Sequence, residues 1–105
     1  MKIVVTSMAD SATAQFDRRF GRASWFCLFD TETEEQRFIE NEKRDASNGA
    51  GLNAASIFGE LGVTKVISGD FGPKAKELLN KFEIQMVTID EVDVTIDQII
   101  EKVRK

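Results

Sequence analysis

The chain has 105 residues, 42% of them hydrophobic and 30% charged, and its 14 basic and 18 acidic side chains give a formal net charge of −4. This charge argues against a protein that coats nucleic acid or an anionic membrane, because both partners need a cationic face, and no apolar run approaches the roughly 20 residues of a membrane span. The absence of histidine excludes a Ser-His-Asp hydrolase and a zinc site of the usual cysteine–histidine kind, and the single cysteine permits no internal disulfide, which suits a reducing cytoplasm.

The first half of the chain predicts three strands. Residues 2–6 form a β-branched run typical of a strand buried on both faces, and residues 24–30 are apolar on both alternating faces. After a polar tip, residues 36–42 predict a third strand near the sheet edge. A polar connection, residues 8–22, separates the first two strands and is long for so small a domain, so we expect it to be functional. Its segment 10–14 has few anchoring groups, which predicts mobility.

The second half alternates helices with strands. Apolar side chains recur at helical spacing over residues 52–61, and Gly62 stands where a glycine would end that helix. Residues 63–68 and 84–89 predict two further strands. Between them, a helix begins at Pro73, which suits the first turn of a helix.

A capping box of Thr95 and Gln98 predicts the start of a last helix. The predicted order is therefore β-β-β-α-β-α-β-α, which belongs to the α/β class with a mixed five-stranded sheet and helices on its faces. We expect one domain over residues 1–105. Cys27 lies in the middle of the second strand and is expected to be an inert core thiol.

The predicted strand directions bring four connections to one rim of the sheet. If the first strand runs up, the third, fourth and fifth run up as well, so the chain leaves all four at the same edge. Ligands of open α/β sheets collect at such an edge. The connections that meet there are residues 8–22, 45–51, 69–73 and 90–94.

These connections carry the residues best suited to an anion. Arg18, Arg19 and Arg22 lie close together in the long connection, and guanidinium groups suit oxyanions and polarisable anionic clusters. The glycine-bearing turns at residues 47–51 and 69–73 each introduce a helix, so the first amides of both helices would face the rim. Together these features predict an anion-binding site.

Each feature also has a purely structural interpretation. The glycines can serve only tight strand-to-helix turns, and neither turn is a Walker A loop or a Gly-x-Gly-x-x-Gly fingerprint. Met8 is the methionine at the rim, where a thioether could meet a soft metal. The arginines can instead pair at the surface with Asp10, Asp17 and Asp70.

Five segments, in their order and spacing, resemble the dinitrogenase iron-molybdenum cofactor biosynthesis family: residues 1–7, residues 20–23 with Phe26, and residues 48–51, 69–73 and 95–97. The resemblance covers nearly the whole chain. It implies a ribonuclease H-like three-layer fold and a nitrogen fixation-related role. It also implies a non-covalently bound iron-molybdenum or molybdenum-sulfide cluster, because characterised members bind or carry such cofactors or their precursors without hydrolytic activity.

The chain departs from the family pattern where family members often carry histidine. Arg19 occupies one of these positions, and Asn53 is the nearest match to the other. This favours an anionic sulfide cluster held by arginines and backbone amides over direct coordination by imidazole. The predicted cofactor-binding residues are Arg18, Arg19, Arg22, Gly49, Gly51, Asn53, Gly69 and Gly72.

The expected function is a cytoplasmic, non-enzymatic binder or carrier of an anionic metallocluster, with a protein partner in cluster assembly and neither nucleic acid nor membrane as partner. The alternative is a regulatory or interaction module that binds a small anion or a protein partner and no metal. A ribonuclease H-like nuclease would need several carboxylates around two divalent ions. The first strand has no acid, and Asp70 is the only acid well placed at the end of a central strand.

Overall fold

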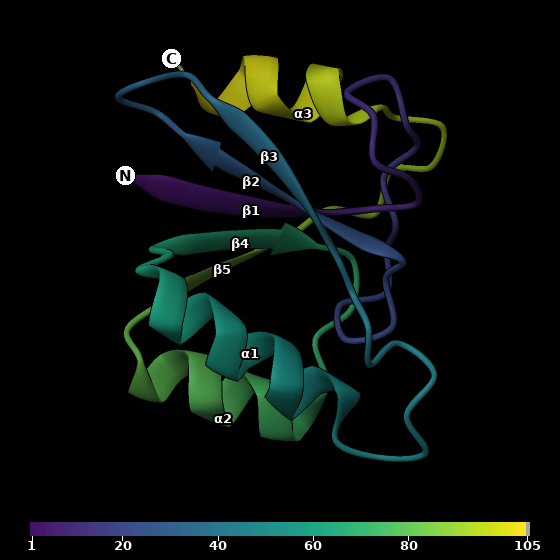
Figure 1. Cartoon of the computed structure of the whole chain (residues 1–105), viewed down its shortest axis with the longest axis vertical. Helices are drawn as coiled ribbons and strands as arrows, with labels where there is room; N and C mark the ends of the chain where they lie inside the picture. The colour runs from purple at the N-terminus through teal and green to yellow at the C-terminus, as the bar shows by residue number, and fades with distance from the viewer. Residues whose placement is uncertain (105) are drawn as a thin grey trace.

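The computed structural model describes residues 1–104 as a three-layer α/β arrangement (Figure 1). The strands and helices follow one another in the order predicted from the periodicity: β1 (Lys2–Ser7), β2 (Trp25–Asp30), β3 (Gln36–Glu40), α1 (Ala50–Leu61), β4 (Lys65–Ser68), α2 (Pro73–Lys81), β5 (Gln85–Thr88) and α3 (Ile96–Val103). The α/β class is confirmed. The ribonuclease H-like classification stays a prediction.

The five strands form one mixed sheet in the order β3-β2-β1-β4-β5. β2 pairs antiparallel with both β1 and β3, whereas β4 pairs in parallel with β1 and β5. The central strand β1 is buried from Ile3 to Ser7, which explains its continuous apolar run. Strand β3 lies at the sheet edge, as predicted from its polar composition.

Helices α1 and α2 cover one face of the sheet and α3 covers the other, so β1 contributes to two cores (Figure 1). Val4 packs in the core beneath α1 and α2, together with Phe26 and Phe58. Ile3 and Val5 face the other way, into the core beneath α3. In residues 1–104, no helix is both long and apolar enough to cross a membrane.

The helix ends follow local signals in the sequence. Helix α1 ends at Gly62, whose φ of 75° is left-handed and favours glycine. The capping box of Thr95 and Gln98 is present at the start of α3. One detail of α1 differs from its predicted stripe: Leu52 is 38% exposed, because the helix instead buries the alanines of its first two turns, Ala50, Ala54 and Ala55, with Phe58.

The connection between β1 and β2 is anchored along its length, so the expectation that segment 10–14 lacks anchoring groups is wrong. The carbonyls of Ala12 and Ala14 accept hydrogen bonds from the Asp97 and Ile96 amides, at 2.9 and 3.0 Å. Phe16 is 4% exposed and adds an apolar anchor. The segment therefore caps the N-terminus of α3 and has a structural role there.

Cys27 lies in the core beneath α3, and burial raises the pKa of its thiol to about 12. Because an unfolded thiol has a pKa near 8.5, the folded state holds the proton more tightly and folding stability should fall as the pH rises through about 9 to 12. We expect the unfolding free energy to fall by up to about 1.4 kcal/mol per pH unit more than in Cys27→Ala. Urea titrations of both proteins at pH 8, 9, 10 and 11 measure this difference. Parallel losses in the two proteins would contradict it.

Candidate functional site

The carboxyl ends of β1, β3, β4 and β5 share one edge of the sheet, as predicted, on the right of Figure 1. An open groove of about 940 Å³ lies at this edge. Three of the four predicted connections contribute to it. Its lining consists of Arg19, Phe20, Gly21, Arg22, Asn48, Gly49, Ala50, Gly51, Leu52, Asp70, Gly72, Pro73, Lys74 and Ala75.

Two helix N-termini open into this groove without a capping side chain. The N-cap residues are Gly49 in α1, whose φ of 78° is left-handed, and Gly72 in α2. By contrast, the first three amides of α3 are satisfied by the carbonyls of residues 12 and 14 and by the Thr95 hydroxyl. Within residues 1–104, no protein atom accepts a hydrogen bond from the amides of Ala50, Gly51, Leu52, Lys74 and Ala75. These amides, at the positive ends of two helix dipoles, are suited to an anion.

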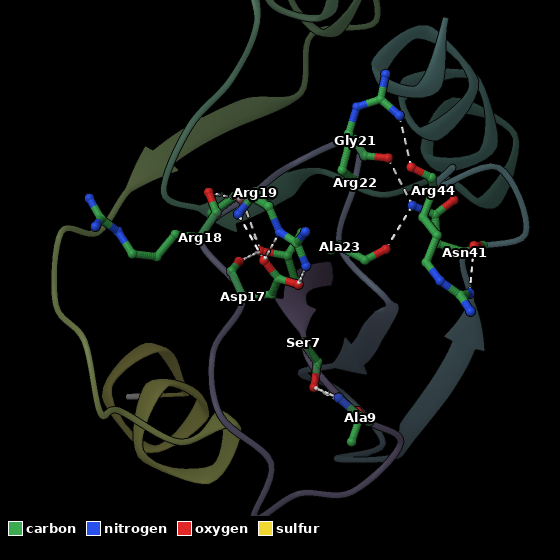
Figure 2. A network of polar contacts seen from close by, with 12 residues as sticks. Ser7, Ala9, Asp17, Arg18, Arg19, Gly21, Arg22, Ala23, Asn41 and Arg44 are labelled. Atoms are coloured by element: carbon green, nitrogen blue, oxygen red, sulfur yellow. Dashed lines mark hydrogen bonds and ion pairs between the residues drawn. The ribbon is translucent and has the colours of Figure 1, made fainter. Parts of the chain in front are cut away.

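Close backbone packing at Gly21 holds the long connection against the first turn of α1. A Cβ atom on Gly21 would lie 2.6 Å from both the amide nitrogen and the Cα of Gly51. From the other side, the buried Asn41 side chain donates to the carbonyls of Gly21 and Ala23, at 2.9 and 2.8 Å (Figure 2). The wall of the groove between Gly21 and α1 is therefore fixed by backbone contact and by two buried hydrogen bonds.

Arg22 is oriented by the connection between β3 and α1. Its Nη1 donates to the carbonyl of Arg44 at 2.9 Å (Figure 2) and to the carbonyl of Ala46 at 2.7 Å. Within the described residues, nothing accepts a hydrogen bond from Nε or Nη2. The guanidinium is thus held by one nitrogen and keeps the edge formed by the other two, which is the edge that binds oxyanions in a bidentate manner.

Arg19 reaches the groove as part of an ion pair. Asp17, 1% exposed, accepts from the Arg19 backbone amide and from Nε at 3.0 Å, and from Nη2 at 2.9 Å (Figure 2). The hydrogen bond and charge of Asp17 raise the pKa of Arg19. Arg19 therefore pairs with an acid, as the purely structural interpretation predicts. Asp17 offsets much of the charge of Arg19.

Three predicted site residues do not line the groove. Arg18 extends away from Arg19 and Arg22 (Figure 2). Its Nη2 pairs with Asp90 Oδ1 at 3.3 Å. Gly69 packs against the Arg18 backbone, where a Cβ atom would lie 2.8 Å from the Arg18 carbonyl oxygen. Asn53 lies one turn further along α1. The groove brings together the other five: Arg19, Arg22, Gly49, Gly51 and Gly72.

Lys74 and Asp70 line the groove but were absent from the predicted site. The signal for Lys74 was its place directly after Pro73, in the first turn of a helix that begins at the rim. The sequence places Asp70 at the end of a central strand and among the acids that can pair with the arginines at the surface, but it does not assign Asp70 to the site. Gly21 was part of a recognised motif, but its contact with α1 links residues far apart in sequence and could not be anticipated from spacing.

The donor set of the groove suits an anion and does not suit direct coordination of a soft metal. Its charged side chains are Arg19, Arg22, Lys74 and Asp70, and its lining has no cysteine or methionine. Cys27 is buried in the core on the α3 side, away from this lining. In residues 1–104, no three or more side chains of Cys, Asp or Glu are grouped so that they could hold a metal ion. An anionic cluster would be held here by charge and N–H donors.

A second hollow, of about 490 Å³, lies beside α3 and has the opposite charge balance. Its charged lining residues are Glu91, Asp93, Glu101 and Lys102, and Lys102 pairs with Glu91 at 3.6 Å. The excess of acid there disfavours anions. Of these two hollows, the groove at α1 and α2 is the candidate anion site.

Comparison with known proteins identifies a family and a fold. Residues 1–105 match the family described as dinitrogenase iron-molybdenum cofactor. The apo form of the orange protein from Desulfovibrio gigas is 30% identical, with a TM-score of 0.88 over 96% of this chain and 84% of that chain. A NifB-like protein of the DUF35 family from Thermotoga is 24% identical and shares the fold, with a TM-score of 0.82 over 98% of this chain and 89% of that chain.

A curated relative also matches part of the chain. It is an uncharacterized protein from Methanocaldococcus jannaschii that is 31% identical over 70 residues. The match covers 64% of this chain and 59% of the relative. The chain therefore spans less than two thirds of the length of that relative.

Proposed function

The chain belongs to the dinitrogenase iron-molybdenum cofactor family, and we propose that it binds and carries an anionic metallocluster, or a precursor of one, without catalysing a reaction. The cargo is an iron-molybdenum-cofactor-like or molybdenum-sulfide cluster. One observation carries the proposal: two uncapped helix N-termini line the same groove as Arg22, whose guanidinium is held through Nη1 alone.

The physical basis is hydrogen bonding and charge. A cluster whose surface is made of sulfide or oxide accepts N–H donors in many directions, and each hydrogen bond to a charged group contributes about 1.5–3 kcal/mol. Lys74 and Arg22 supply positive charge, and the open amides of α1 and α2 supply donors. Because none of these groups forms a covalent bond to metal, a cluster held this way can pass to a protein partner that offers thiolate or imidazole ligands. This suits a carrier.

Anaerobic reconstitution tests the proposal. The purified protein is incubated with tetrathiomolybdate, alone and with iron(II) or copper(I), then desalted and analysed for metal and visible absorbance. We expect stoichiometric retained molybdenum with a charge-transfer band at low salt. We also expect loss of the metal in about 1 M salt, where the screening length falls to about 3 Å.

A control for salt-induced unfolding is the circular dichroism spectrum at the same salt concentrations, which should not change. Absence of retained molybdenum at low salt would contradict the carrier function. It would favour the module that binds a small anion or a protein partner without metal.

A further inference from the structure

Asn48 and Gly49 form the only asparagine–glycine pair in the chain, and both residues line the groove. Asparagine is chemically labile when the next backbone nitrogen can reach its side-chain amide, and glycine allows this approach best because it has no Cβ atom. The pair lies in the connection between β3 and α1, which loops away from the sheet before the chain enters the helix (Figure 1).

The backbone around this pair is unrestrained. The last hydrogen bond before it is made by the Ala46 carbonyl, which accepts from Arg22 Nη1, and the first one after it is made by the Gly49 carbonyl, which accepts from the Asn53 amide at 2.9 Å. Within residues 1–104, neither the Gly49 amide nor the Asn48 side chain takes part in a hydrogen bond. No atom lies within 4 Å of the place where a Cβ of Gly49 would stand. The Gly49 nitrogen is therefore free to approach the Asn48 side chain.

The other three asparagines of the chain lack this freedom. Asn41 is 1% exposed, and its side-chain amide donates to the carbonyls of Gly21 and Ala23. Asn53 and Asn80 lie within α1 and α2, where the amide of the next residue points along the helix axis into a backbone hydrogen bond. These three residues therefore serve as internal controls for the reactivity of Asn48.

We propose that Asn48 is a site of spontaneous deamidation and that the carboxylate produced there closes the groove to anions. The Gly49 nitrogen loses its proton and bonds to the side-chain carbonyl carbon of Asn48, whose bond to the amide nitrogen breaks as ammonia leaves. Water then opens the resulting cyclic imide at one of its two carbonyls, which yields aspartate or isoaspartate. The inference rests on the proposed function and adds a modification that regulates the same site.

The new carboxylate would lie directly before Gly49, the N-cap of α1. The helix dipole favours a negative charge at this end, so the fold does not oppose the product. The same charge repels an approaching anion and competes with it for the open amides of Ala50 and Gly51. The groove would then lose affinity for anions although Arg22 and Lys74 are unchanged.

Ageing of the purified protein tests both steps. The wild type and Asn48→Gln, whose longer side chain disfavours ring closure, are incubated for several days in mildly alkaline buffer, and peptide mapping by mass spectrometry locates each conversion. Tetrathiomolybdate affinity is measured by anaerobic equilibrium dialysis before and after ageing, and also in fresh Asn48→Asp and Asn80→Asp. Asn80→Asp is the matched control, because it adds the same charge at an exposed position at the C-terminal end of α2, outside the groove lining.

We expect the wild type to convert at Asn48, to keep its other three asparagines, and to lose tetrathiomolybdate affinity about tenfold. Fresh Asn48→Asp should show the same loss, whereas Asn80→Asp should stay within about twofold of the fresh wild type. Aged Asn48→Gln should bind as its fresh counterpart does.

An intact Asn48 after ageing would overturn the modification site, and equal affinities of Asn48→Asp and Asn80→Asp would overturn its effect on the groove. Both results leave the carrier function intact. If the fresh wild type does not bind tetrathiomolybdate, the proposed function fails and the effect on the groove fails with it, while the peptide map still decides whether Asn48 is modified.

Discussion

Replacing Arg22 with alanine is expected to weaken binding of tetrathiomolybdate about 30-fold, because it removes a charged hydrogen-bond donor that contributes about 2 kcal/mol. The side chain reaches the groove already oriented, since Nη1 is held by the carbonyls of Arg44 and Ala46. The free edge of the guanidinium therefore loses little conformational entropy on binding. Anaerobic equilibrium dialysis with molybdenum analysis measures the change.

Arg18→Ala is the matched control. It removes the same charge from the same connection, but Arg18 is 47% exposed and paired with Asp90 outside the groove, so its affinity should stay within about twofold of the wild type. Arg22→Lys keeps the charge without the planar fork and should recover only part of the loss. Equal losses of tetrathiomolybdate affinity in Arg22→Ala and Arg18→Ala would show that net charge alone governs binding. Arg22 would then make no specific contact with the anion.

The sequence predicted the fold well because its signals were local. A buried β-branched run, a terminating glycine at Gly62 and a capping box at Thr95 each depend on neighbouring residues, and each is present in the structure. The shared rim followed from the strand directions. The first three strands alternate in direction as a meander, and the helical crossovers keep the fourth and fifth strands parallel to the first. The general location of the groove was therefore predictable.

The direction of each arginine was not predictable, because it depends on partners far away in sequence. Arg18 and Arg22 lie four positions apart. Arg18 pairs with Asp90 outside the groove, whereas Arg22 donates to the carbonyls of residues 44 and 46 and lines the groove. The segment 10–14 is a similar case, because its anchoring partners are amides at the start of α3. Periodicity gives no information about such long-range contacts.

The glycines of the site show the same distinction. Gly49 has a positive φ and is the N-cap of α1. A glycine in a strand-to-helix turn predicts such a position. No positive φ requires glycine at position 21, and the requirement there is space next to Gly51. Spacing in the sequence does not show that two backbones approach so closely.

Gly21→Ala is therefore expected to destabilise the protein by about 3 kcal/mol and to lower its melting temperature by about 15 °C. The new methyl carbon would lie 2.6 Å from the backbone of Gly51 and 3.0 Å from the carbonyl carbon of Ala50. Since these neighbours are backbone atoms, no side-chain rotation can relieve the overlap, and the long connection must move away from α1. The thermal unfolding curve measures the loss of stability.

Gly72→Ala provides the control for a glycine-to-alanine change at the same groove. Its φ of −68° suits any residue, and no atom lies within 4 Å of the added Cβ, so stability should change by less than about 0.5 kcal/mol. Because the contact at Gly21 also sets the distance between Arg22 and the amides of α1, Gly21→Ala should lose tetrathiomolybdate binding even at temperatures where it remains folded. A variant that is destabilised but binds normally would show that the groove tolerates displacement of its wall, and that the donors act independently of their spacing.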